Sequence, residues 1–110
     1  MLTNAGKDAA LLSLFVHETV YLSIRSAGTV SEPSQRKLVQ FTEPSGADRH
    51  IENRAELSFL VTKAQTVDGW QITDSAGVAL ANGELEEELP MRANEEVVFR
   101  PGDVVLRIEP

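Results

Sequence analysis

The chain has 110 residues, of which 42% are hydrophobic and 25% charged, as expected for one globular domain. It carries 17 acidic and 10 basic side chains, a formal net charge of −7. Because a negative surface repels nucleic acids and anionic membranes, we expect neither as a partner. The sequence has no cysteine, which excludes disulfides, thiolate metal sites and cysteine nucleophiles, and which fits folding in a reducing cytoplasm.

The first segment has helical spacing. Leu11 and Phe15 lie four residues apart among other apolar residues, and Thr3 can cap the first turn. The pattern predicts a short N-terminal helix over about residues 4–16, lying across one end of a sheet. Charged residues interrupt this segment, so we expect it to belong to the mature fold rather than to a signal peptide.

Beyond residue 17, apolar residues recur at every second position. Val20, Leu22 and Ile24 alternate with polar neighbours, which predicts a half-buried strand. Glycine, proline and serine residues between positions 26 and 35 predict a loop, and residues 38–41 predict a second strand.

Residues 43–55 form a strongly polar stretch, which predicts a long loop. Loops of this length in compact domains are often binding elements, but they can equally be mobile surface segments. The sequence leaves both alternatives open.

The second half of the chain has the pattern of short strands separated by turns. Residues 56–61 predict one strand, and residues 69–85 predict a β-hairpin that turns at Asp74-Ser75-Ala76-Gly77. Residues 97–99 and 104–108 are predicted to pair with each other across a turn at 100–103. Trp70 lies in an alternating strand and is expected in the core.

This pattern predicts a mainly β fold for residues 1–110. We expect a single-domain β-sandwich, jelly-roll-like or immunoglobulin-like, with the short N-terminal α-helix.

No catalytic, cofactor-binding or metal-binding motif is present in the sequence, so we expect no cofactor and no enzymatic activity. His17 and His50 have no metal-ligand spacing and are expected to be structural. The acidic run that contains Glu84 is expected to be solvated and to prevent edge-to-edge sheet pairing, with docking to a basic surface as the alternative. The candidate partner-contact residues come from the polar stretch and from this acidic run: Glu43, Asp48, Arg49, His50, Glu86, Glu87 and Glu88.

Several segments resemble small virion structural proteins of tailed bacteriophages, of the head-decoration or tail-fibre-like kind. The resemblance rests on residues 1–12 with the strand 20–23, on residues 67–77 with their D-x-x-G turn, and on residues 93–104. Glu95-Glu96 stands where such proteins commonly have glycine-aspartate, and residues 26–56 depart from the pattern. The resemblance implies a virion part that is made in the host cytoplasm and assembles as a symmetric oligomer.

These observations favour a capsid decoration or minor capsid protein at the capsid surface, which binds the assembled shell and bridges major capsid subunits. A homotrimer is the expected form, because closed symmetry would match the threefold positions of a capsid. The first alternative is a minor tail or tail-fibre-associated protein. A small carbohydrate- or peptide-binding module is the alternative from another class, and a hydrolase is the weakest.

Overall fold

The computed structural model describes residues 2–32 and 35–108. Met1, residues 33–34 and residues 109–110 lie outside the described part, and with them two positions of the predicted 26–35 loop. The predicted N-terminal helix is confirmed: α1 (Asn4–Leu11) continues into the π-helical segment η1 (Leu12–Val16). The Thr3 hydroxyl caps α1 by accepting a hydrogen bond from the Gly6 N–H at 3.1 Å. Within the described part of the chain, no helix is long and apolar enough to cross a membrane.

The larger sheet is antiparallel and has β1 and β6 at its centre. Its strand order is β2-β1-β6-β7, and β3 pairs with the first half of β1 beside β2. The strands of this sheet are β1 (Val20–Ser26), β2 (Thr29–Ser31), β3 (Lys37–Val39), β6 (Gln65–Asp74) and β7 (Ala79–Met91).

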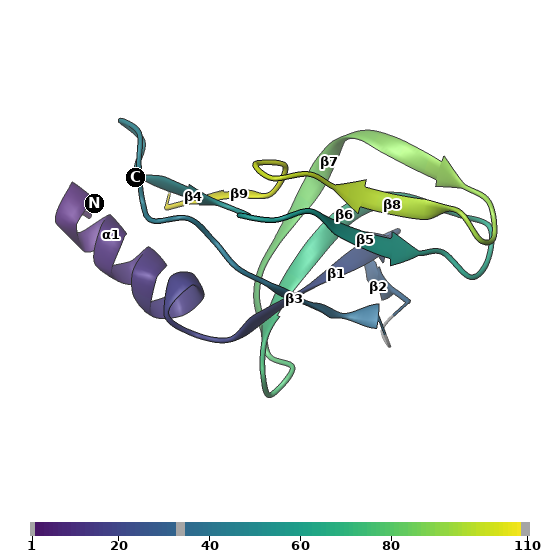
Figure 1. Cartoon of the computed structure of the whole chain (residues 1–110), viewed down its shortest axis with the longest axis horizontal. Helices are drawn as coiled ribbons and strands as arrows, with labels where there is room; N and C mark the ends of the chain where they lie inside the picture. The colour runs from purple at the N-terminus through teal and green to yellow at the C-terminus, as the bar shows by residue number, and fades with distance from the viewer. Residues whose placement is uncertain (1, 33–34, 109–110) are drawn as a thin grey trace.

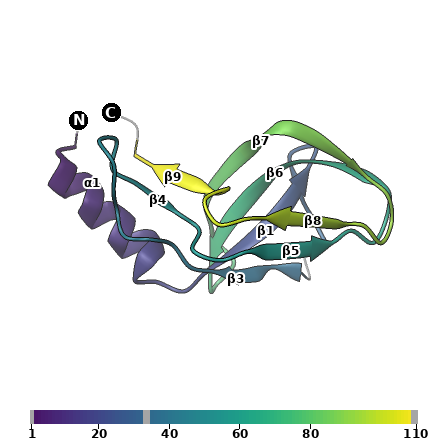
Figure 2. The ribbon, with the colours of Figure 1, turned by 45° about the horizontal axis from the view of Figure 1, so that its top comes forward.

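Two antiparallel ribbons form the second layer. The strand β5 (Leu57–Leu60) pairs with β8 (Glu96–Phe99), and β4 (His50–Glu52) pairs with β9 (Val105–Arg107). The β5–β8 ribbon lies across from β1 and β6, and α1 lies beside β4 and β9 at one end of the molecule (Figures 1 and 2). The fold is therefore mainly β with one short N-terminal helix, an arrangement consistent with the β-sandwich that the sequence predicts.

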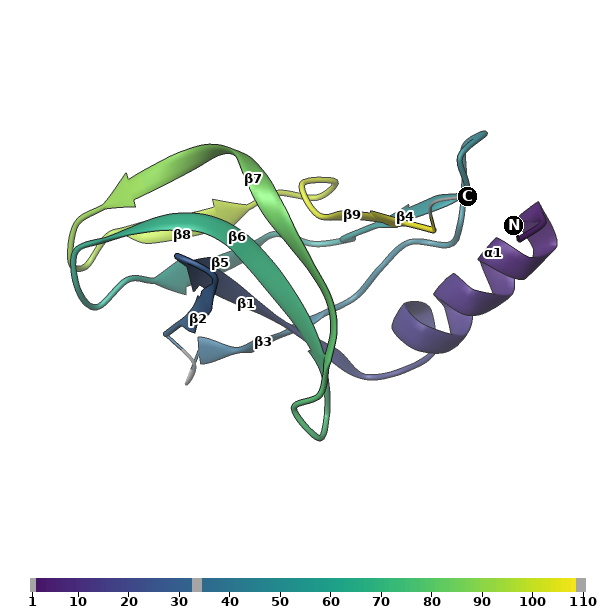
Figure 3. The ribbon, with the colours of Figure 1, turned by 180° about the vertical axis from the view of Figure 1, so that it is seen from behind.

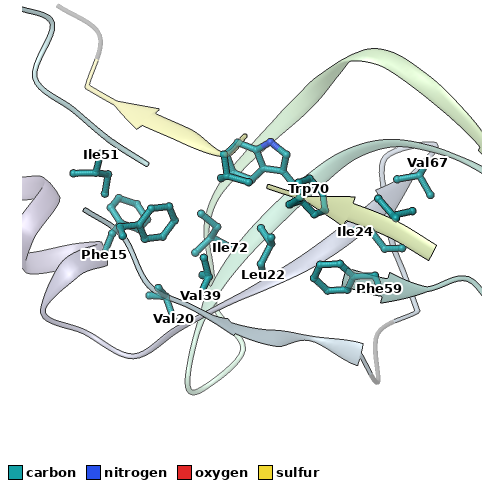
Figure 4. Packing of buried hydrophobic residues seen from close by; sticks show 14 of the residues in the cluster. Phe15, Val20, Leu22, Ile24, Val39, Ile51, Phe59, Val67, Trp70 and Ile72 are labelled. Carbon is teal, nitrogen blue, oxygen red and sulfur yellow. The ribbon is translucent and has the colours of Figure 1, made fainter. Parts of the chain in front are cut away.

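The core fills the space between the two layers. Val20, Leu22 and Ile24 of β1 are fully buried, as their alternation predicts. Trp70 is 7% exposed, which confirms its predicted place in the core. From the second layer, Phe59 and Phe99 meet edge to face with ring centroids 5.8 Å apart. Figure 4 shows Leu22 and Ile24 of β1, Trp70 of β6 and Phe59 of β5 converging in this space. Phe15 packs against Phe41, which extends the core under the helix.

The predicted hairpin over residues 69–85 is confirmed and is longer than predicted, since β6 and β7 run together over most of their length (Figure 3). The turn lies where the sequence indicates. The Asp74 carbonyl accepts from the Gly77 N–H at 3.0 Å, and the Asp74 carboxylate accepts from the N–H groups of Ala76 and Val78 at 2.9 Å each. Gly77 has a φ of +86°, a conformation that glycine adopts without strain.

The predicted pairing of residues 97–99 with 104–108 is wrong. The turn at 100–103 exists, with the Asp103 N–H donating to the Arg100 carbonyl at 3.0 Å, but the chain does not reverse there. Instead β8 and β9 run on in one direction, antiparallel to β5 and β4. The turn is a short excursion between β8 and β9, and buried Asn53 stabilises it. The Asn53 side chain donates to the Arg100 carbonyl at 2.9 Å and accepts from the Val104 N–H at 2.9 Å.

Two predicted loops also contain strands. The 43–55 segment contains the turn and the second arm of a hairpin, with β4 in that arm, and Ser45 and His50 exchange two backbone hydrogen bonds of 2.9 Å across it. Fully buried Ile51 anchors this arm in the core, through a single apolar residue that a polar stretch does not reveal. Within the 26–35 segment, β2 pairs with the end of β1 across a turn at Ala27 and Gly28.

We predict that Gly83→Ala destabilises the fold by about 1–3 kcal/mol, the usual cost of overpacking a core. A Cβ atom at position 83 would lie 2.4 Å from Cζ2 of the Trp70 ring, so the indole would have to move. Urea denaturation followed by the fluorescence of this single tryptophan measures the effect. The control is Asn82→Ala at the exposed neighbouring position. Equal urea midpoints for the two variants would contradict the close packing of Trp70 against Gly83.

Candidate functional site

The polar hairpin is tied to the N-terminal helix. Arg49 donates two hydrogen bonds of 2.8 Å from Nε and Nη2 to the two carboxylate oxygens of Asp8, and a third of 3.1 Å to the Pro44 carbonyl. Arg49 adopts a φ of +51°, a left-handed conformation that costs a non-glycine residue about 1 kcal/mol. The hydrogen bonds from Arg49, followed by its charge, hold the pKa of Asp8 below the ordinary aspartate value.

A second set of contacts joins the same hairpin to β9. The Asp48 carboxylate lies 2.7 Å from His50 Nδ1 and 3.1 Å from Arg107 Nη1, and His50 Nε2 lies 3.9 Å from Glu52. The hydrogen bond with His50, assisted by its charge and by Arg107, lowers the pKa of Asp48. Three of the predicted contact residues, Asp48, Arg49 and His50, therefore hold the protein's own elements together. Glu43 is exposed at the base of the hairpin.

The acidic run lies in β7 at a large register shift. Gly69 of β6 pairs with Glu84 of β7, and the next pair joins Val67 to Leu89. A step of two residues along β6 therefore corresponds to a step of five residues along β7. The three extra residues form a wide bulge, which bends β7 and leaves its residues 85–88 without partners in the β6 ladder. The run was predicted to lie at the end of the hairpin, and it lies instead within a strand that extends to Met91.

The bulge divides the acidic run between two hollows. Glu86 and Glu87 line a groove between β7 and β8, together with Glu84. Glu88 lines a second hollow with Arg25 and Asp68, and Glu84 borders both hollows. The structure thus places the predicted contact residues on different elements, with one set at the helix end and the other on β7.

The groove between β7 and β8 has a volume of about 460 Å³, within the range of ligand-binding pockets. The two strands are consecutive in the chain, yet the described residues show no ladder between them. Apolar side chains lie along the groove, and three of them keep substantial exposure: Leu89 at 36%, Val98 at 45% and Val105 at 37%. Four carboxylates accompany them, from Glu84, Glu86, Glu87 and Asp103.

The acidic side of this groove is evident from the sequence, whereas its apolar side is not. Val98 lies between two inward-facing residues of β8, so strand alternation assigns it to the outer face, where an aliphatic residue is unexpected. That mismatch is a usable signal. The position of Leu89 and Val105 beside Val98 could not be found, because it depends on the bulge and on the true partner of β9.

The described residues differ from a metal site and from an aromatic stacking platform. Among them, no group of three or more histidine or acidic side chains is arranged to hold a metal ion. Trp70 shows little of its surface, which leaves no open ring face for stacking a sugar or a base. No protein-family model, curated protein or solved structure matches this chain.

We predict that Asp8→Asn loosens α1 at neutral pH, since it removes the charge that Arg49 pairs with. The backbone amides of Asn4–Leu11 should exchange with deuterium faster than in the parent chain. Glu18→Gln is the control, because Glu18 is an exposed carboxylate just beyond the helix. Unchanged exchange in Asp8→Asn would show that the ion pair does not hold the helix.

The same contact should weaken in acid. Because the pKa of Asp8 is lower in the folded chain than in the unfolded one, its pairing stabilises the fold fully above the ordinary aspartate pKa of about 3.9. That stabilisation is lost as the pH falls through the lowered value. Exchange of the α1 amides, corrected for intrinsic rates, should therefore rise below about pH 4 in the parent chain and stay flat in Asp8→Asn.

Proposed function

We propose that this chain is a non-enzymatic virion structural protein that decorates a bacteriophage capsid, binding the assembled shell and bridging major capsid subunits. The groove between β7 and β8 carries the protein-binding part of the proposal. It combines exposed aliphatic side chains with carboxylates beside strand edges, and an apolar centre with a polar rim is how protein contacts are arranged. The resemblance of residues 1–12, 20–23, 67–77 and 93–104 to small phage virion proteins supports the virion part.

Charge supports the same proposal. A net charge of −7 keeps separate copies apart at high concentration, until a partner with a complementary surface overcomes the repulsion. One groove offers a modest contact area, but a symmetric trimer would present three copies to a threefold position of the shell. Contacts that are weak singly then add through effective concentration.

The proposal predicts that purified chain rebinds to shells that lack it. Recombinant protein is mixed with such shells, and the mixture is separated by sedimentation. We expect the chain to move with the shells, and expect Glu86→Lys with Glu87→Lys to abolish this, since both residues lie in the groove. Glu18→Lys is the control for a charge change elsewhere, and it should bind as the parent does.

Copy number in intact particles distinguishes the capsid from the tail. Quantitative mass spectrometry should find the chain in amounts comparable with the major capsid subunit. A few copies per particle would assign it to the tail, and its complete absence from particles would overturn the virion proposal.

A further inference from the structure

We propose that the groove accepts an extended segment of the partner protein, in which aliphatic residues alternate with lysine or arginine, and that this segment adds as a strand to the open edge of β8. The proposal rests on the proposed function, since it describes how the decorating chain would hold its partner. It specifies the binding mode, the edge used and the chemistry of the bound segment.

The outer edge of β8 is open. β8 pairs with β5 alone among the described strands. The Val61 N–H donates to the Glu95 carbonyl at 2.9 Å, and in an antiparallel ladder the bonded pairs recur at every second residue. The backbone groups of Val97 and Phe99 therefore face β5, while those of Glu96 and Val98 face away from it. These outward N–H and C=O groups are the ones that an added strand would bond.

The edge of β7 across the groove is less suited to strand addition. Its bulge breaks the regular spacing of backbone groups, and Pro90 lacks an N–H. The Ser26 hydroxyl donates to the Thr66 carbonyl at 2.6 Å, so that carbonyl points away from β7. Pro90, opposite Thr66, therefore turns its nitrogen to the open edge. The incoming strand would thus pair with β8, and β7 would supply side-chain contacts.

The side chains around the groove define the composition of the incoming segment. Successive residues of a strand face opposite sides, so alternate residues would face the buried side of the groove, where Trp70, Leu85 and Phe99 lie. Those positions favour aliphatic side chains. The intervening residues would face the rim, which carries four carboxylates. No lysine, arginine or histidine lines the groove among the described residues, so cations at these positions meet no like charge.

A purely protective edge and a contact between two copies of this chain both fit the groove less well than a partner's strand does. Acidic residues on the edge of β7 would be enough to block aggregation at that edge. That role does not explain the three exposed aliphatic side chains or the open edge of β8 beside them. A second copy of this chain could add its own β7 or β8. That arrangement would bring the carboxylates of two grooves together without cations, which disfavours a symmetric strand pair.

The test uses a fluorescein-labelled peptide of alternating valine and lysine as the probe, with binding to the full chain followed by fluorescence anisotropy. We expect saturable binding, and expect alternating valine and glutamate to fail. Two further peptides carry N-methyl groups on alternate amides, in opposite phases. Strand addition predicts that at least one of the two methylated peptides loses affinity by about tenfold or more, because the N–H groups that its methyl groups replace donate to β8. Equal binding of both methylated peptides and the parent peptide would overturn strand addition.

Variants of the chain locate the peptide. Glu86→Gln with Glu87→Gln should weaken binding by about tenfold, and Leu85→Ala should weaken it similarly, since one change removes the rim charge and the other an aliphatic contact on the buried side of the groove. Glu43→Gln, exposed on another element, is the control and should leave affinity unchanged. Equal losses in Glu43→Gln and the groove variants would mean that net charge alone attracts the peptide, and would overturn the proposal.

The outcomes separate this inference from the proposed function. A chain that sediments with shells but does not bind the valine-lysine peptide retains its decorating role and loses the strand-addition mode. A chain that binds the peptide as described but is missing from particles retains the groove as a strand receptor and loses the virion role.

Discussion

The register shift between β6 and β7 is the constraint on which the rest of the structure depends. Three extra residues in β7 turn that strand away from the plane of β6, so that β7 curves over the core. Just before the bend, Gly83 lies against the Trp70 ring, where a Cβ atom would not fit. The tryptophan thereby covers the middle of the core from one side, while Phe59 and Phe99 cover it from the other.

The same bend gives the molecule its asymmetry. At one edge of the larger sheet, β2 and β3 both pair with β1 and cover that strand. On the other side, β7 and β8 diverge and leave the groove between them. At the bulge, the exposed carboxylates of Glu86 and Glu87 border a row of exposed aliphatic side chains. At the far end, the Asp8–Arg49 pair ties the helix to the polar hairpin, and the Asp48–Arg107 contact ties the hairpin to β9.

The sequence predicts those features that depend on neighbouring residues. Alternation places Val20, Leu22 and Ile24 in the core, and the turn residues Asp74 and Gly77 locate the long hairpin. It fails where distant residues decide the outcome. The turn at 100–103 carries an ordinary reversal pattern, and hydrogen bonds from the side chain and the backbone of Asn53, far away in sequence, make it an excursion. The groove depends on the offset between two strands, which composition and periodicity do not contain.

Amide exchange in the unbound chain, measured residue by residue with NMR, tests most directly whether β8 offers an unoccupied strand edge. Val97 and Phe99 face β5, so their amides should be protected, whereas the amides of Glu96 and Val98 should exchange at rates close to those of an unstructured chain. An alternating pattern along these four residues supports the open edge. Uniform protection of all four would show that another strand already occupies that edge, and would contradict the groove as a place for a partner's strand.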